Sequence, residues 1–364
     1  MHFVLFALLI IVYFVTGGDR SMYSVTVRRK QVIWMGFVIF LFAALRAHTV
    51  GTDIWGYFGD FVNDSTYSFT EILDVRQGRD PFFHIVLHVL SFLSDNPQIM
   101  LVFVGAVVAI GFSYFTYYQK GHVLLFFVLF IGFRMYSFTL SGIRQACAMS
   151  FVYIAYIQLR NHKAIPYFLL SLFASLFHQS ALISLLFYPI FKVKNDYLVL
   201  SGALLVILGN IVSGGALAAL LASTVFKERF EGYIIRSTGY SDWGLTFLIY
   251  FVVYLLVLAR HKRMETQNKG FHEDFRMLTV AIMFAFIGQT TDTVFRLNYY
   301  FIFIVIPLFS QVIKALSGGN VQTEKSLTAF VIILMMTQYL VLGASGVDNY
   351  EFFWKVPYNY NNYQ

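Results

Sequence analysis

Long apolar segments follow one another along the chain, separated by short polar stretches. Runs of about 15 to 20 apolar residues are typical of helices that cross a bilayer. The pattern therefore predicts an all-α, polytopic membrane protein with about twelve transmembrane helices. The predicted spans are roughly 2–16, 32–46, 99–118, 122–138, 143–159, 164–177, 179–191, 197–213, 244–259, 275–290, 297–314 and 327–343.

A thirteenth apolar stretch, near 82–94, is shorter and follows Asp80 and Pro81. The positive-inside rule places basic connections in the cytoplasm. Those connections are 17–30, 160–163, 192–194 and 260–263. These connections all lie on the cytoplasmic side only if the segment 82–94 does not cross the membrane. We therefore expect a re-entrant or interfacial helix there. The segments then predicted to be external are both termini, the loops 47–98 and 214–243, and the tail 344–364.

Composition agrees with a membrane protein, since 58% of the 364 residues are hydrophobic and 12% are charged. Soluble domains average about a quarter charged residues. No polar segment is long enough to bury a core of its own, so we expect residues 1–364 to form a single integral membrane domain. The net charge of +7 is explained by basic cytoplasmic loops and does not indicate nucleic acid as a partner.

Several kinds of site are excluded or unsupported. The one cysteine, Cys147, lies in an apolar segment, which excludes a disulfide framework and a cysteine metal site. The N-terminal segment has no basic region and no small-residue cleavage site, so we interpret it as an uncleaved first helix. P-loop, HExxH and DxD motifs are absent, so we expect no cofactor, no metal and no nucleotide-sugar donor site.

Ionisable groups at membrane depth usually mark function. One external group joins Arg46, the turn Gly51-Thr52-Asp53 and Tyr57. Gly51 allows a tight turn, and Asp53 is placed to act as a base or to orient an arginine. The plainer interpretation is an arginine at a helix end followed by an ordinary turn.

A second external group is FRMYSFTLSGIRQ, where Arg134 and Arg144 flank a break and Gly142 to Gln145 open the next helix. Arginines and free amides at a helix N-terminus form an anion site. The alternative is an interfacial hairpin whose arginines contact lipid phosphates.

Two further groups complete the external set. His178 lies between apolar helices and is either a packing residue or a proton carrier or ligand. Asp292 and Arg296 are spaced as a helical ion pair, and Tyr299 belongs to an aromatic pair that also suits a membrane interface. The acidic stretch 60–80 is consistent with a solvated loop.

The ordered motifs resemble the EpsG family, whose members are similar to Wzy-type polymerases of bacterial exopolysaccharide, capsule and O-antigen. The resemblance rests on an arginine before GTD with a tyrosine four residues later, on GIRQ, and on FHxS. The matching residues are Arg46, Gly51, Thr52, Asp53, Tyr57, Gly142, Ile143, Arg144, Gln145, Phe177, His178 and Ser180. It covers about residues 30–190 well, and Arg296 with Tyr299 extends it further.

This resemblance implies a GT-C-like glycosyltransferase in the bacterial cytoplasmic (inner) membrane. Its substrate would be an oligosaccharide repeat unit on undecaprenyl pyrophosphate, joined to a second unit at the external face with release of undecaprenyl pyrophosphate. Its partners would be the bilayer and, in the same pathway, a flippase and a chain-length regulator.

The chemistry that the resemblance implies assigns roles to the polar groups. Arg144 is the first candidate for the pyrophosphate, with Arg46, Arg134 and Arg296 as further contributors. Asp53 and His178 are the two candidate bases, and Asp53 is slightly preferred. Gln145, Tyr57 and Tyr299 are candidates for sugar binding.

Other functions remain open from sequence. A flippase or transporter of the lipid-linked sugar needs polar groups along both halves of a pathway, and here the cytoplasmic half carries charges only in loops. A polysaccharide ligase would use the same leaving group. A membrane acyltransferase based on His178 would not need the arginines.

Overall fold

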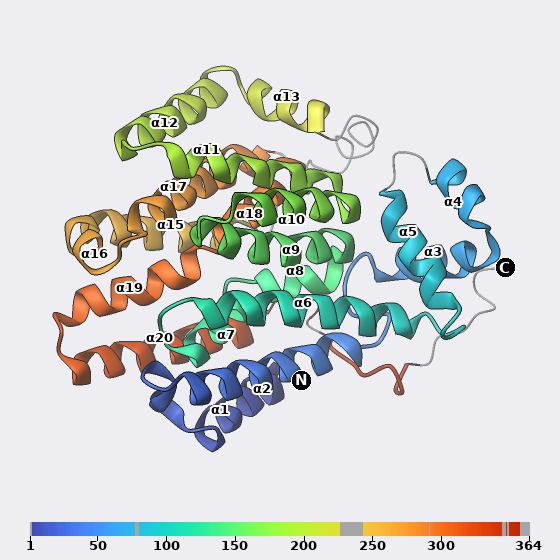
Figure 1. The fold of residues 1–364 in the computed structure, drawn as a ribbon, viewed down its shortest axis with the longest axis horizontal. Helices are drawn as coiled ribbons and strands as arrows, with labels where there is room; N and C mark the ends of the chain where they lie inside the picture. Colours follow the sequence, from blue (N-terminus) through green and yellow to red (C-terminus); the bar gives the residue numbers. More distant parts are fainter. Residues whose placement is uncertain are drawn as a thin grey trace. The chain divides into compact units, whose positions relative to one another are not determined.

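The computed structural model describes residues 2–76, 80–225, 243–290, 292–343, 347 and 349–356, and helices dominate these ranges (Figure 1). The chain is therefore an all-helical, apolar-rich membrane protein, as predicted. It divides into two compact units. Unit 1 comprises Met1–Gln158, Ile165–Ala181 and Ile333–Gln364, and unit 2 comprises Leu159–Ala164 and Leu182–Ile332. The expectation of a single membrane domain stays a prediction.

The helices up to residue 177 are α1 (His2–Val15), η1 (Gly18–Met22), α2 (Val25–Ala44), α3 (Ile54–Thr66), α4 (Phe69–Val75), α5 (Pro81–Ser91), α6 (Gln98–Tyr118), α7 (Val123–Gly132), α8 (Met135–Ser141), α9 (Ile143–Arg160) and α10 (Ala164–Phe177). They are followed by η2 (Gln179–Leu186), α11 (Phe187–Lys192), α12 (Asp196–Val212), α13 (Ala216–Val225), α15 (Trp243–Ala259), α16 (His261–Gln267), α17 (Phe271–Ile287), η3 (Gly288–Thr290), α18 (Asp292–Ile302), α19 (Val305–Ser317) and α20 (Val321–Leu342).

By length and composition, two described helices can cross a membrane unaided, namely α6 and α20. Two more candidates are bent pairs, α7 with α8 at 57° and Val294–Ile302 with α19 at 54°. Several shorter helices are also apolar, including α1, α5, α10 and α12. The twelve-span count and the GT-C-like fold stay predictions.

Close helix packing holds the core of unit 1 together. Gly36 of α2 faces α6, and a Cβ added there would overlap the hydroxyl of Ser113. Small residues at such contacts let helix backbones approach closely. In a bilayer the hydrophobic effect does not favour contact between helices, so their association depends on this close packing. The contact aligns α2 with α6 and thereby fixes the loops at both ends of these helices.

The N-terminal end of α2 lies against the C-terminal end of α6. Arg28 donates hydrogen bonds from Nε to the carbonyl of Tyr117 at 3.1 Å, from Nη1 to that of Gly121 at 2.8 Å, and from Nη2 to that of Thr116 at 2.6 Å. The predicted cytoplasmic segment 17–30 is thus attached to the connection that follows α6.

The other end of α2 pairs with the C-terminal segment. Arg46 and Phe352 form an antiparallel bridge, Ala47 N donates to Glu351 O at 2.8 Å, and Phe353 N donates to Leu45 O at 3.0 Å. The segment that follows Arg46 and the tail, both predicted to be external, are therefore joined to each other. Their orientation in a bilayer stays a prediction.

The segment 47–98 contains more helix than the sequence suggested. We expected one short helix near 82–94, and the structure has α3, α4 and α5, of which α3 and α4 each pack on α5 (Figure 1). Helix α4 begins with a capping box, in which Glu71 N donates to Ser68 Oγ and Ser68 N donates to the Glu71 carboxylate. The acidic stretch 60–80 is thus largely helical in its described part.

Charged side chains bind the three helices together. Asp64 of α3 is fully buried and accepts from Arg76 Nη2 at 2.8 Å and from His84 Nδ1 at 2.6 Å. Asp60 makes a second contact with Arg76 at 2.9 Å. A solvated loop does not bury a paired carboxylate, so that interpretation was wrong for Asp64 and Arg76.

In unit 2, α17 contacts α12, α15 and α18. Three predicted cytoplasmic connections meet at one end of this group. Arg160 forms an ion pair with Asp274 and donates to Gly270 O at 3.3 Å, while Asp196 contacts His272 at 2.6 Å. These contacts bring the three connections together, and their common cytoplasmic side stays a prediction. The predicted external loop 214–243 is described only up to residue 225 and at residue 243.

Candidate active site

The Gly51-Thr52-Asp53 turn lies against the end of α8. Gly51 has φ of +107°, and a Cβ there would overlap the carbonyl oxygen of Leu140, so both the conformation and the space require glycine. Thr52 N donates to Ser141 Oγ at 3.2 Å. The predicted tight turn is confirmed, and it touches the residues that immediately precede α9.

Helices α7, α8 and α9 follow one another with two breaks. Arg134 has φ of +61° at the first break, where the chain bends by 57°, and its side chain is half-buried. Gly142 forms the second break, and α9 begins at Ile143. The prediction that Gly142 to Gln145 open a helix is confirmed, and Arg144 lies in the first turn of α9.

Asp80 brings together the groups that the sequence left apart. It precedes Pro81 at the N-terminus of α5 and has φ of +57°. Its Oδ2 accepts from His178 Nδ1 at 2.9 Å and lies 3.2 Å from Arg144 Nη1, while Oδ1 accepts from Gln179 N at 3.1 Å. We call Asp80, Arg144 and His178 the Asp80 cluster.

Tyr57 of α3 adds an aromatic wall to the Asp80 cluster. Arg144 Nε donates to the Tyr57 hydroxyl at 3.3 Å, and the guanidinium lies 5.4 Å from the centre of the Tyr57 ring. A cation over an aromatic face is attracted by the ring electrons. Tyr57 and Asp80 thus fix the direction of the Arg144 guanidinium.

The Asp80 cluster is recessed but not sealed. The exposed fractions of the side chains are 7% for Asp80, 14% for His178 and 16% for Arg144. Burial alone would raise the pKa of the Asp80 carboxyl, but the hydrogen bond from His178 and the charges of His178 and Arg144 lower it to about 2. Asp80 is therefore a carboxylate at neutral pH.

Arg46 occupies a structural position. It is fully buried, and it donates to Ala43 O at 2.6 Å and to Leu140 O at 3.1 Å. It thus ties the end of α2 to α8, beside the carbonyl that Gly51 approaches. Its guanidinium is held by main-chain carbonyls, so the phosphate contact expected for Arg46 is better suited to the partly exposed Arg144.

Asp53 lies away from the Asp80 cluster. Its side chain is exposed, and within the described residues its carboxylate contacts the Thr52 hydroxyl at 3.4 Å and neither Arg144 nor His178. It precedes α3 without capping it through its side chain. The sequence-based preference for Asp53 as base therefore gains no support from this geometry.

The remaining candidates are divided between the units. Gln145 is buried on α9, beside Arg144. Arg296 and Tyr299 lie on α18 in unit 2, where Arg296 is half-buried and Tyr299 is buried. The side chain of Asp292 lies outside the described residues, so its predicted ion pair with Arg296 stays a prediction.

Sequence reasoning placed Asp80 in the acidic stretch 60–80 but missed it as a site residue. The local signal was present, because an aspartate before a proline commonly begins a helix and tolerates a positive φ. The long-range signal was not, since Asp80 and His178 lie 98 positions apart along the chain. Only folding brings α5, α9 and α10 together around this carboxylate.

The Asp80 cluster has the parts for proton transfer beside an anion. A carboxylate that accepts from Nδ1–H of His178 leaves Nε2 as the basic nitrogen of the neutral imidazole. An arginine in the first turn of a helix attracts phosphate. A different group, Asp196 with His261 and His272 in unit 2, has the spacing of metal ligands.

The model of the EpsG family matches residues 31–360, a range that contains the whole Asp80 cluster. No curated protein and no solved structure matches the chain.

Proposed function

The chain belongs to the EpsG family, and from that premise we propose that it polymerises oligosaccharide repeat units carried on undecaprenyl pyrophosphate. The reaction is glycosyl transfer at the external face of the bacterial cytoplasmic membrane. Family membership indicates a role of the polysaccharide-polymerase type. The observation that carries the more specific proposal is the Asp80 cluster, which combines a base with an anion-binding arginine.

In this proposal His178 is the general base. Asp80 accepts the Nδ1 proton of His178, which orients the ring and makes Nε2 the basic nitrogen that would take the proton of the acceptor hydroxyl. A positioned base of this kind contributes about 10²- to 10⁴-fold to a rate. We prefer His178 to Asp53 because His178 shares the Asp80 carboxylate with Arg144 and Asp53 does not.

Arg144 is proposed to bind the pyrophosphate of the donor. Negative charge develops on the leaving oxygen as the glycosidic bond breaks, and a fixed guanidinium stabilises that charge without reorganising. Asp80 and Tyr57 hold Arg144 in place. Arg134, at the bend before α8, is proposed as a second cation for the phosphates.

The proposed reaction balances as follows. A hydroxyl of one lipid-linked unit loses its proton to His178 and attacks the anomeric carbon of the other unit. The bond between that carbon and the pyrophosphate oxygen breaks, and undecaprenyl pyrophosphate leaves with the electron pair. Gln145 follows Arg144 along the chain, and the Tyr57 hydroxyl accepts a hydrogen bond from Arg144. Both side chains are suited to hydrogen-bond sugar hydroxyls.

The test is elongation by the purified protein in detergent, with lipid-linked repeat units extracted from polymerase-deficient bacteria. Wild type should convert them to a ladder of longer lipid-linked glycans, and Arg144→Ala should leave single units. As a control, Arg29→Ala removes an exposed arginine near the N-terminus of α2 and should leave the ladder unchanged.

Two outcomes contradict the proposal. Translocation of the same lipid across liposomes without elongation would identify a flippase. Transfer of the glycan to a different acceptor would identify a ligase. A full ladder from Arg144→Ala would instead show that Arg144 is not needed for the reaction, without contradicting the proposal that the protein is a polymerase.

A further inference from the structure

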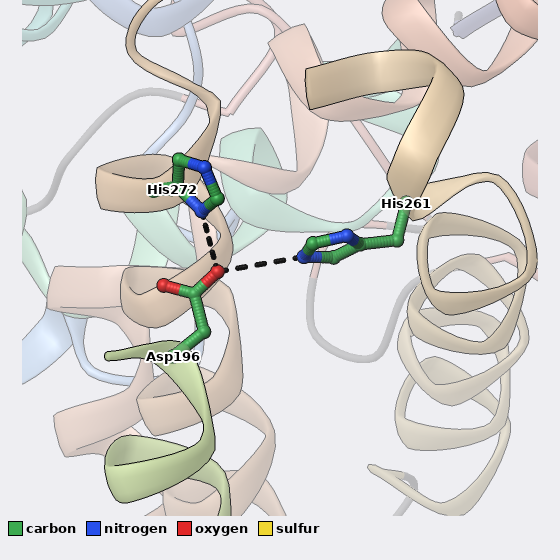
Figure 2. A group of neighbouring side chains, drawn as sticks. All are labelled: Asp196, His261 and His272. Atoms are coloured by element: carbon green, nitrogen blue, oxygen red, sulfur yellow. Dashed lines mark hydrogen bonds and ion pairs between the residues drawn. The ribbon is translucent and has the colours of Figure 1, made fainter. Parts of the chain in front are cut away.

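Two histidines and an aspartate from three helices of unit 2 meet at one point (Figure 2). Asp196 is the first residue of α12, His261 the first residue of α16, and His272 the second residue of α17. All three belong to connections that the charge pattern predicts to be cytoplasmic. Their spacing along the chain forms no local motif, so the group was not predictable from sequence.

The three side chains are within the reach of a single ion. Asp196 Oδ2 lies 2.6 Å from His272 Nδ1 and 3.4 Å from His261 Nε2 (Figure 2). One ligand atom from each residue lies within 4.8 Å of the others. Ligands about 2.0–2.2 Å from a zinc ion are roughly 3 to 4 Å apart, so small adjustments of these side chains would bring the three ligand atoms to coordination distance.

The surroundings of these atoms also suit a metal. Glu265 Oε1 lies 3.2 Å from His272 Nε2, the ring nitrogen that does not face Asp196. A metal-bound histidine usually donates its second N–H to a carboxylate, which fixes the ring. Arg276 Nη1 contacts Oδ1 of Asp196 at 3.2 Å, so the other oxygen, Oδ2, is the one directed at the histidines.

Solvent can reach the group. The exposed fractions of the side chains are 40% for His272, 27% for His261 and 12% for Asp196. An ion therefore has an entry path, and water can complete its coordination. Imidazole nitrogens with one carboxylate favour zinc and related first-row ions over magnesium or calcium, which prefer oxygen ligands.

We propose that Asp196, His261 and His272, the Asp196 cluster, bind one divalent transition-metal ion of the zinc class. The ion connects the starts of α12, α16 and α17, and so links three predicted cytoplasmic connections of unit 2. The inference does not depend on the polymerase proposal. Its alternative is a group of hydrogen-bonded ion pairs that holds no metal.

The experiment titrates the purified, chelator-treated protein in detergent with zinc chloride by calorimetry and with cobalt chloride by visible absorption. Wild type should take up one equivalent of each ion. The conservative variants Asp196→Asn, His261→Gln and His272→Gln should each lose affinity about 100-fold or more. Glu265→Gln should lose about tenfold, because it only orients His272.

The matched control is His162→Gln, which removes an exposed histidine from another connection of unit 2 and should bind zinc like wild type. Zinc should also raise the Tm of wild type and of His162→Gln but not of the three ligand variants, which reports on binding to folded protein. Absence of zinc uptake by wild type, or unchanged affinity in any of the three ligand variants, would overturn the proposal.

Discussion

The Asp80 cluster of unit 1 and the Asp196 cluster of unit 2 use an aspartate, histidine and a neighbouring arginine in different ways. In unit 1, His178 and Arg144 both contact the same oxygen, Oδ2 of Asp80. In unit 2, Arg276 contacts Oδ1 of Asp196, and two histidines contact Oδ2. The same residue types occur at both clusters. The clusters differ in whether the arginine and the histidine contact the same carboxylate oxygen or different ones.

This difference has chemical consequences. An oxygen shared by imidazole and guanidinium fixes a histidine next to a cation, which suits proton transfer beside a phosphate. An oxygen directed at two imidazoles provides three ligands around one point, which suits a metal ion. A histidine beside an aspartate is therefore not enough to distinguish a proton-transfer site from a metal site. The carboxylate oxygen that the arginine contacts must also be known.

Replacing one histidine of each cluster by glutamine should give the largest difference in effect between the two clusters. His178→Gln should lower the elongation rate about 10³-fold, because the proposed base is lost. His272→Gln should lose zinc and keep elongation unchanged. Gel analysis of lipid-linked products checks the first result and calorimetry the second. Equal loss of elongation in both variants would mean that the clusters do not have separate roles.

Arg144→Lys should lower elongation about 10²-fold, since lysine lacks the guanidinium fork that contacts Asp80 and is proposed to bind the phosphates. The matched variant Arg276→Lys keeps the charge beside Asp196 and should elongate like wild type. Single-turnover rates with saturating lipid check the prediction. A loss in apparent affinity alone for Arg144→Lys would assign this arginine to binding rather than to the leaving group.

Asp80→Asn should lower elongation about tenfold to a hundredfold, a smaller loss than removal of His178 itself. Asparagine retains the shape of the side chain but not the charge that fixes the imidazole tautomer. If Asp80 positions His178 as proposed, kcat should fall and KM should stay near that of wild type. An effect confined to KM would contradict this role.

The smallest expected effect concerns acid stability. The pKa of Asp80 is about 2 in the folded protein, below the value of about 3.9 for an unfolded chain, so its charge stabilises the fold above about pH 4. This contribution, on the order of 2 kcal/mol, is lost as pH falls from about 4 through 2. Wild type should therefore exceed Asp80→Asn in Tm at pH 6, and the gap should close towards pH 2. A constant gap would contradict the low pKa.

Local patterns predicted part of this structure correctly. The helix from Ile143 and the tight turn at Gly51 follow from glycines placed beside apolar runs, and both are present. The apolar length of α1, α6 and α10 was also sufficient to place them within a few residues. These features depend on neighbours along the chain, which a sequence displays directly.

Other features depend on distant contacts and could not be predicted. The stretch 297–314 has a continuous apolar pattern, yet the chain bends by 54° before Val305 because hydropathy does not report direction. Helix α4 had a readable signal in Ser68 and Glu71, which form its capping box. Asp80 and the Asp196 cluster had none of comparable strength, because their partners lie on other helices.

The chain is synthesised from its N-terminus, so Arg46 is made long before its bridge partner Phe352. The Tyr350 hydroxyl donates to Phe42 O at 2.5 Å across 308 residues. At about 5–20 residues per second, roughly 15 to 60 s separate the two segments during translation. The end of α2 therefore reaches its final packing only after residues 350–353 have been made, and translation products that end before residue 350 lack this closure.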